Sequence, residues 1–85
     1  MTINYKGISK DFDYRVAEIH FDDEKEMVLM NRLAFWLEKV KGYTVDIITD
    51  GYAVVEVENM EEYKEFKTDY MVGKKMIKDC IKFGF

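Results

Sequence analysis

The stretch from Tyr43 to Glu58 constrains the fold most strongly, because it predicts a β-hairpin in the middle of the chain. Residues 44–49 and residues 52–58 are rich in β-branched and aromatic side chains, which suit a pleated, half-buried surface. Between these two runs, Asp50 and Gly51 form a pair that is typical of a two-residue type I′ turn. A turn of this kind fixes the register of the two strands, and therefore which side chains share a face.

The two arms of this hairpin predict one apolar face and one mixed face, because side chains alternate along a strand. The face expected to point into the core carries Val45, Ile47, Ala53, Val55 and Val57. The face expected to point outward carries Thr44, Asp46, Ile48, Tyr52, Val54, Glu56 and Glu58.

Further strand signals precede the hairpin. Residues 12–21 alternate between apolar and polar side chains around Ala17 and Ile19, as a half-buried strand does. Residues 2–6 are a candidate short edge strand, and we expect residues 7–11 to turn the chain. The sheet is therefore expected to have three antiparallel strands, with residues 2–6 as a candidate fourth.

A first helix is expected from Asp22 or Asp23, either of which can serve as its N-cap, to about Lys41. Gly42 follows, and glycine is common just beyond a helix C-terminus. At roughly 100° per residue, one broad face of this helix is apolar and should form part of the core. That face carries Leu29, Met30, Leu33, Trp36, Leu37 and Val40, with Met27 and Ala34 at its border.

A second helix is expected directly after the hairpin. Asn59 is its predicted N-cap, and Glu62 three residues later is close to a capping-box pattern. Its apolar stripe is spaced by three and four residues and should pack on the sheet. The stripe consists of Tyr63, Phe66, Tyr70, Gly73, Ile77 and Cys80. Gly73 indicates either a kink or a close approach between this helix and the sheet.

The order β-α-β-β-α predicts an α+β fold, a two-layer sandwich in which two helices cover one face of an antiparallel sheet. Residues 1–85 are expected to form a single compact domain, which buries only about 60–65% of its unfolded surface. The composition, with 48% hydrophobic and 35% charged residues, is typical of a soluble globular protein.

A cytoplasmic location is expected, because no stretch approaches the roughly 18–20 apolar residues of a membrane span and the first residues lack a signal peptide. Cys80 is the single cysteine, so no disulfide can form within these residues, which fits a reducing compartment. We expect Cys80 to act as a small apolar core residue.

The residue types that nucleophilic catalysis requires are scarce. Ser9 is the single serine and His20 the single histidine, and Cys80 lies on the expected core stripe. We therefore expect a protein without catalytic residues and without a cofactor. A divalent-metal enzyme remains a third hypothesis, because His20, Asp22 and Asp23 place an imidazole and two carboxylates near one strand end.

Charge is distributed unevenly along the chain, whose net charge is −4. Residues 46–69 contain eight acidic residues and two lysines, which gives −6, whereas residues 70–85 contain four lysines and one aspartate, which gives +3. Carboxylates on the outward sheet face would repel a phosphate backbone, so direct nucleic-acid binding is not expected there. The lysine cluster is either a binding surface or ordinary solvated surface, and comprises Lys74, Lys75, Lys78 and Lys82.

The acidic stretch predicts a non-catalytic protein-binding module. Carboxylates held on a hairpin and on the adjoining helix can imitate spaced phosphates and occupy the groove of a basic nucleic-acid-binding protein. This strategy is similar to that of small phage-encoded inhibitors of host nucleases and defence complexes. The residues expected to contact such a partner are Asp46, Glu56, Glu58, Glu61, Glu62 and Glu65.

An alternative is a homo-oligomeric structural or regulatory module, such as a homodimer. Val28 and Phe35 lie seven residues apart on the polar side of the first helix, beside Arg32. An aligned apolar pair next to an arginine is typical of the core of a protein interface. The pair serves equally well for a second copy of the chain and for a foreign protein.

Overall fold

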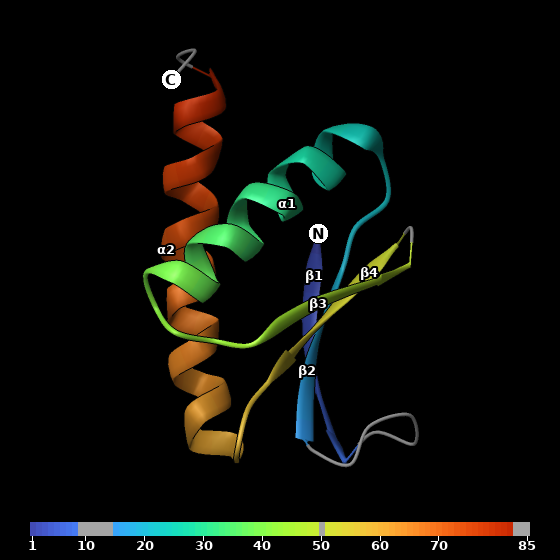
Figure 1. The fold of residues 1–85 in the computed structure, drawn as a ribbon, viewed down its shortest axis with the longest axis vertical. Helices are drawn as coiled ribbons and strands as arrows, with labels where there is room; N and C mark the ends of the chain where they lie inside the picture. Colours follow the sequence, from blue (N-terminus) through green and yellow to red (C-terminus); the bar gives the residue numbers. More distant parts are fainter. Residues whose placement is uncertain (9–14, 50, 83–85) are drawn as a thin grey trace.

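The computed structural model describes residues 1–8, 15–49 and 51–82, which form a two-layer α+β domain (Figure 1). Its elements in chain order are β1 (Thr2–Ile8), β2 (Arg15–His20), α1 (Glu24–Lys39), β3 (Val45–Thr49), β4 (Tyr52–Glu56) and α2 (Met60–Lys82). The predicted class and both helices are confirmed, and the candidate edge strand is the fourth strand. The predicted turn beyond residue 8, the start of the strand predicted from residue 12, and Asp50 lie outside the described residues.

The four strands form one antiparallel sheet in the order β1-β2-β4-β3. Two hairpins, β1–β2 and β3–β4, are therefore joined side by side through β2 and β4, and β1 and β3 form the two edges. Gly7, which was expected in a turn, lies within β1 at a break in register. Its φ of +71° is a conformation that glycine adopts without strain.

Both helices lie on the same side of the sheet, where α1 crosses α2 obliquely (Figure 1). The core between the two layers contains Ala17 and Ile19 from β2, Val55 from β4, Leu33 from α1 and Phe66 from α2. These residues belong to the faces that the sequence periodicity assigned to the interior. Burial of this apolar surface is the main favourable contribution to folding.

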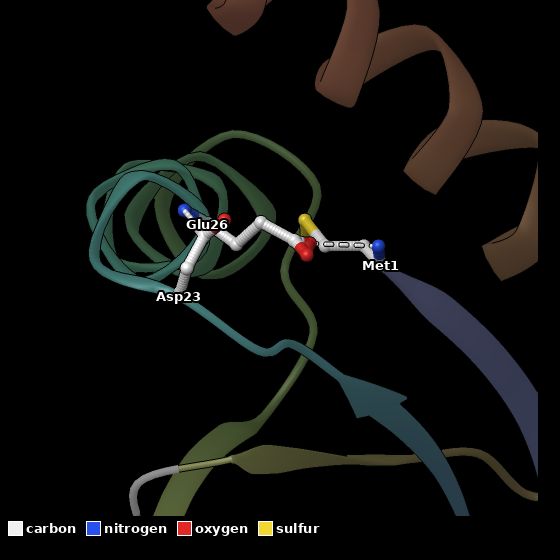
Figure 2. Close-up of polar contacts among 3 residues, drawn as sticks. All are labelled: Met1, Asp23 and Glu26. Atoms are coloured by element: carbon white, nitrogen blue, oxygen red, sulfur yellow. Dashed lines mark hydrogen bonds and ion pairs between the residues drawn. The ribbon is translucent and has the colours of Figure 1, made fainter.

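The start of α1 is fixed by two carboxylates (Figure 2). Asp23 is the N-cap, and its Oδ1 accepts a hydrogen bond of 2.8 Å from the backbone N–H of Glu26. The carboxylate of Glu26 in turn accepts from the amino group of Met1, with 2.7 Å between Oε2 and the nitrogen. This ion pair joins the beginning of β1 to the first turn of α1.

Two apolar residues that were expected in the core are exposed. Val40 is 64% exposed, because α1 ends at Lys39 and Val40 occupies the C-cap beyond the packed turns. Ile47 is 43% exposed, because β3 is an edge strand and has no neighbour on its outer side.

Gly73 marks a close approach between the two helices, not between a helix and the sheet. A Cβ atom built at Gly73 would lie 2.5 Å from Cζ3 of Trp36 and 3.0 Å from Cδ1 of Leu33. Glycine therefore lets the indole ring of α1 pack directly on the backbone of α2. This contact sets where the two helices cross.

The start of α2 follows the predicted capping pattern with a shift of one residue. Oδ1 of Asn59 accepts from the backbone N–H of Glu62 at 2.9 Å. The Glu62 carboxylate accepts a 3.2 Å hydrogen bond from the backbone N–H of Glu58, whereas the capping box predicted the N–H of Asn59 as the donor.

In the ranges that the structure describes, no helix has the length and apolar character of a membrane span.

Candidate protein-binding surface

Three carboxylates gather on the face of the sheet that points away from the helices. Val54 of β4 is paired with Glu18 of β2 on one side and with Asp46 of β3 on the other. Glu56 lies two residues further along β4, diagonal to both. Strand spacing therefore places Glu18 about 10 Å from Asp46, with Glu56 roughly 7–8 Å from each at the Cα level.

This outward face is more tightly packed than the sequence indicated. Val54 was assigned to the outward side, and Val16 lies on the same face through its pairing with Glu56, yet they are only 2% and 0% exposed. They are next to each other in the sheet, because Val16 pairs with Glu56 and Glu18 pairs with Val54. The outward carboxylates thus surround two buried valine side chains.

Glu18 is partly engaged by other side chains of this face. Its Oε1 lies 2.9 Å from Nε2 of His20 and 4.0 Å from Nζ of Lys6. The imidazole of His20 also stacks on the ring of Tyr52, with 5.8 Å between the ring centroids. These contacts leave Asp46 and Glu56 as the more accessible acidic groups of the sheet.

The part of the chain that the structure describes does not assemble a ligand set for the metal-binding hypothesis. His20 is paired with Glu18, whereas Asp23 caps α1 and faces the helix backbone. Among the described residues no group of three or more histidine, cysteine, aspartate or glutamate side chains is placed to hold a metal ion.

A second group of carboxylates lies around a polar groove between the start of α2 and the loop that leads into β3. The groove has a volume of about 400 Å³. Its lining residues are Lys41, Gly42, Tyr43, Asn59, Glu61, Glu62 and Glu65. Three of the six predicted contact residues, Glu61, Glu62 and Glu65, therefore line one groove. They lie in the first two turns of α2, which face the loop before β3.

The phenol of Tyr43 lies at this groove. Its hydroxyl donates to Oδ2 of Asp69 at 2.7 Å, and its ring packs edge-on against Phe66. Burial raises the pKa of the Tyr43 phenol, and the hydrogen bond and charge of Asp69 raise it further, with smaller contributions from Glu65 and Glu62. Lys41, which lines the groove, is directed to Asp69, with 3.7 Å between Nζ and Oδ1.

The two acidic groups adjoin at the end of β4. The backbone N–H of Glu56 donates to the carbonyl of Thr44, the residue that follows Tyr43 of the groove. Glu58 lies between the groups, and its backbone carbonyl accepts a 2.9 Å hydrogen bond from Arg15. We use the name acidic surface for Asp46, Glu56, Glu58, Glu61, Glu62 and Glu65 together.

The predicted set of contact residues did not include two carboxylates of this region, Glu18 and Asp69. The alternation of residues 12–21 placed Glu18 on the outward side, but only the pairing of β2 with β4 brings it near Asp46. Asp69 lies in the third turn of α2, and no local pattern indicated that Tyr43 would reach it.

The apolar pair on α1 is exposed as predicted. Val28 is 48% and Phe35 is 66% exposed, and Arg32 between them is also exposed. Residues 2–8 do not cover them, because these residues form the edge of the sheet. These three residues are called the α1 patch below.

Comparison with protein-family models, with curated proteins and with solved structures finds no match for this chain. Its function is therefore inferred from the geometry of its own residues.

Proposed function

We propose that the protein is a non-catalytic binding module whose acidic surface engages a basic protein. A nucleic-acid-binding protein or a defence complex of the host is the partner class that fits, because its basic groove accepts phosphates and can accept spaced carboxylates in their place. In this role the protein is a small inhibitor of the phage type that imitates nucleic acid and acts in the cytoplasm.

The observation that carries this proposal is the polar groove of Glu61, Glu62 and Glu65. Three glutamates share this depression with a single lysine, and that lysine is already directed to Asp69. An arginine or lysine of the partner can enter the groove and meet carboxylates from two helical turns. Charge-assisted hydrogen bonds of this kind are about twice as strong as neutral ones.

The carboxylates of the sheet extend this contact across the end of β4. Asp46 and Glu56 point away from the helices and are exposed, so a partner that fills the groove also reaches them. Their rigid strand backbone fixes the spacing of the charges before binding, which reduces the entropy lost on association.

A capture experiment with matched charge variants tests the proposal. The tagged protein is used to retain partners from a host lysate fraction that binds heparin, and bound protein is then eluted with double-stranded DNA. We expect a retained protein that DNA releases, and we expect its loss with the double variant Glu56→Lys and Glu65→Lys. Both side chains are exposed, and no hydrogen bond or ion pair holds their carboxylates in the described structure.

The control variant carries Asp22→Lys and Asp79→Lys, which change the net charge by the same amount away from the acidic surface. Capture should persist with this control. Equal loss with both variants, or a partner that DNA does not release, would contradict the proposal.

Self-association through the α1 patch is a second candidate function. Phe35 is 66% exposed and lies near Arg32, and aromatic residues and arginine are both enriched in the cores of protein interfaces. Under this alternative the molar mass in solution doubles at high micromolar concentration, and Phe35→Asp restores the monomer. A monomeric mass for the unmodified chain at that concentration rules this alternative out.

A further inference from the structure

A second groove, of opposite charge, lies between the edge strand β1 and α2. Its volume is about 500 Å³. The residues that matter for its chemistry are Ile3, Lys67, Met71, Lys74, Lys75 and Lys78. Ile3 and Met71 supply apolar surface, and four lysines of α2 surround it against one carboxylate, that of Asp79.

The lysines of this groove are available to a ligand. None of the four forms an ion pair with a described residue, and three of them are exposed. Lys74 is only partly exposed, and its ammonium group lies 5.7 Å from the ring centroid of Tyr70. The groove therefore attracts negative charge.

The other wall of the groove is an open strand edge. β1 pairs with β2 alone among the described strands, so alternate N–H and C=O groups of Thr2–Tyr5 point outward without a main-chain partner. Exposed edges of this kind accept a further strand. The break in register between Tyr5 and Gly7 limits the regular part of this edge to its first four residues.

The dimensions of the two walls match an extended peptide. From Lys67 to Lys78, α2 rises by about 16 Å. That length corresponds to about five residues of a strand. A strand added to β1 turns every second side chain toward the helix layer, so these side chains reach Met71 and the lysines.

We propose that the β1–α2 groove binds an acidic extended segment of another protein as an additional strand beside β1. Apolar side chains of the segment cover Ile3 and Met71, and its carboxylates pair with the lysines of α2. This occupant is favoured over a second copy of the chain. Another copy offers two strand edges, β1 and β3. Pairing of β1 with β1 would bring the lysines of two α2 helices together, and like charges repel. The register of β3 is interrupted between Ile47 and Thr49.

The test uses a fluorescein-labelled heptapeptide with glutamate at its second and sixth positions, valine at its fourth and threonine elsewhere. A peptide with lysine in place of glutamate is the control probe. Binding is followed by fluorescence anisotropy, and backbone amide exchange of the protein is followed by NMR. We expect the acidic peptide to bind and to slow amide exchange within Thr2–Tyr5.

The variant Lys74→Glu and Lys78→Glu should weaken this binding at least about tenfold. The charge-matched variant Lys39→Glu and Lys64→Glu should leave it within about twofold, because both of its sites lie outside the groove. Equal binding of the two peptides, equal loss with the two variants, or unchanged exchange in β1 would overturn the proposal. Assembly of the chain alone that protects the same amides would also overturn it, in favour of a second copy as occupant.

Discussion

The hydroxyl of Tyr70 is buried without a hydrogen-bond partner among the described residues. Burial raises the pKa of this phenol, and the charge of Glu26 adds to the shift. An unsatisfied buried hydroxyl costs about 1–3 kcal/mol. Tyr70→Phe should therefore keep or increase the free energy of unfolding, by up to about 1 kcal/mol, as measured by urea denaturation. A loss of more than about 1 kcal/mol would show that the hydroxyl has a partner in solution.

The same substitution at Tyr43 should have the opposite effect, because this hydroxyl donates to Asp69. Tyr43→Phe should lower the free energy of unfolding by about 1 kcal/mol at neutral pH. Folding raises the pKa of Tyr43, so its contribution is complete below the unfolded pKa of about 10 and is lost as pH rises through the folded value. Urea denaturation at pH 7 and above pH 10 measures this. Between these two pH values the free energy of unfolding should fall more for the unmodified chain than for the variant. An equal fall for both proteins would contradict the prediction.

The contact of Gly73 with Trp36 decides the stability of the helix pair. Alanine is the better helix former by about 1 kcal/mol, but its Cβ would lie 2.5 Å from the indole ring. Overpacking costs about 1–3 kcal/mol, so Gly73→Ala should lower the melting temperature. In the Trp36→Leu background the same substitution should be neutral or stabilising. A double-mutant cycle without coupling would contradict this packing.

The N-cap of α1 gives a second test at the level of one element. Asp23→Ala should cost about 1 kcal/mol, because its carboxylate satisfies the N–H of Glu26. Asp22→Ala is the matched control, with the same loss of charge at an exposed neighbour, and should change stability by less than about 0.5 kcal/mol. Thermal denaturation of both variants measures the difference. Equal effects would mean that charge near the helix terminus, and not capping, is responsible.

Local patterns predicted most of the elements. The hairpin, an N-cap at Asp22 or Asp23, the N-cap at Asn59 and the core faces of both helices follow from alternation, helical periodicity and turn chemistry. The role of Gly73 did not follow, because it depends on where α1 crosses α2. The exposure of Ile47 and Val40 also depends on tertiary position, at a sheet edge and beyond the last packed turn.

At the scale of the whole molecule, the fold separates two surfaces of opposite charge. The acidic surface lies around the end of β4 and the start of α2, whereas the lysines of the β1–α2 groove lie along the rest of α2 and beside the opposite edge of the sheet. The sequence predicted the separation, because acidic and basic residues occupy different stretches. It did not predict the grooves, because each requires a loop or strand that is distant in the chain.

Electrostatic steering makes the central claim measurable. Clefts lined with one sign of charge raise association rates by roughly 10-fold to 1,000-fold, and the effect falls steeply with ionic strength. The measurement is the association rate of the captured partner with the unmodified chain, with the Glu56→Lys and Glu65→Lys variant, and with the Asp22→Lys and Asp79→Lys control, across a range of salt concentrations. The account predicts a rate that falls with salt for the unmodified chain and the control, and a slow, nearly salt-independent rate for the acidic-surface variant. The same salt dependence for all three proteins would contradict a role of the acidic surface in binding.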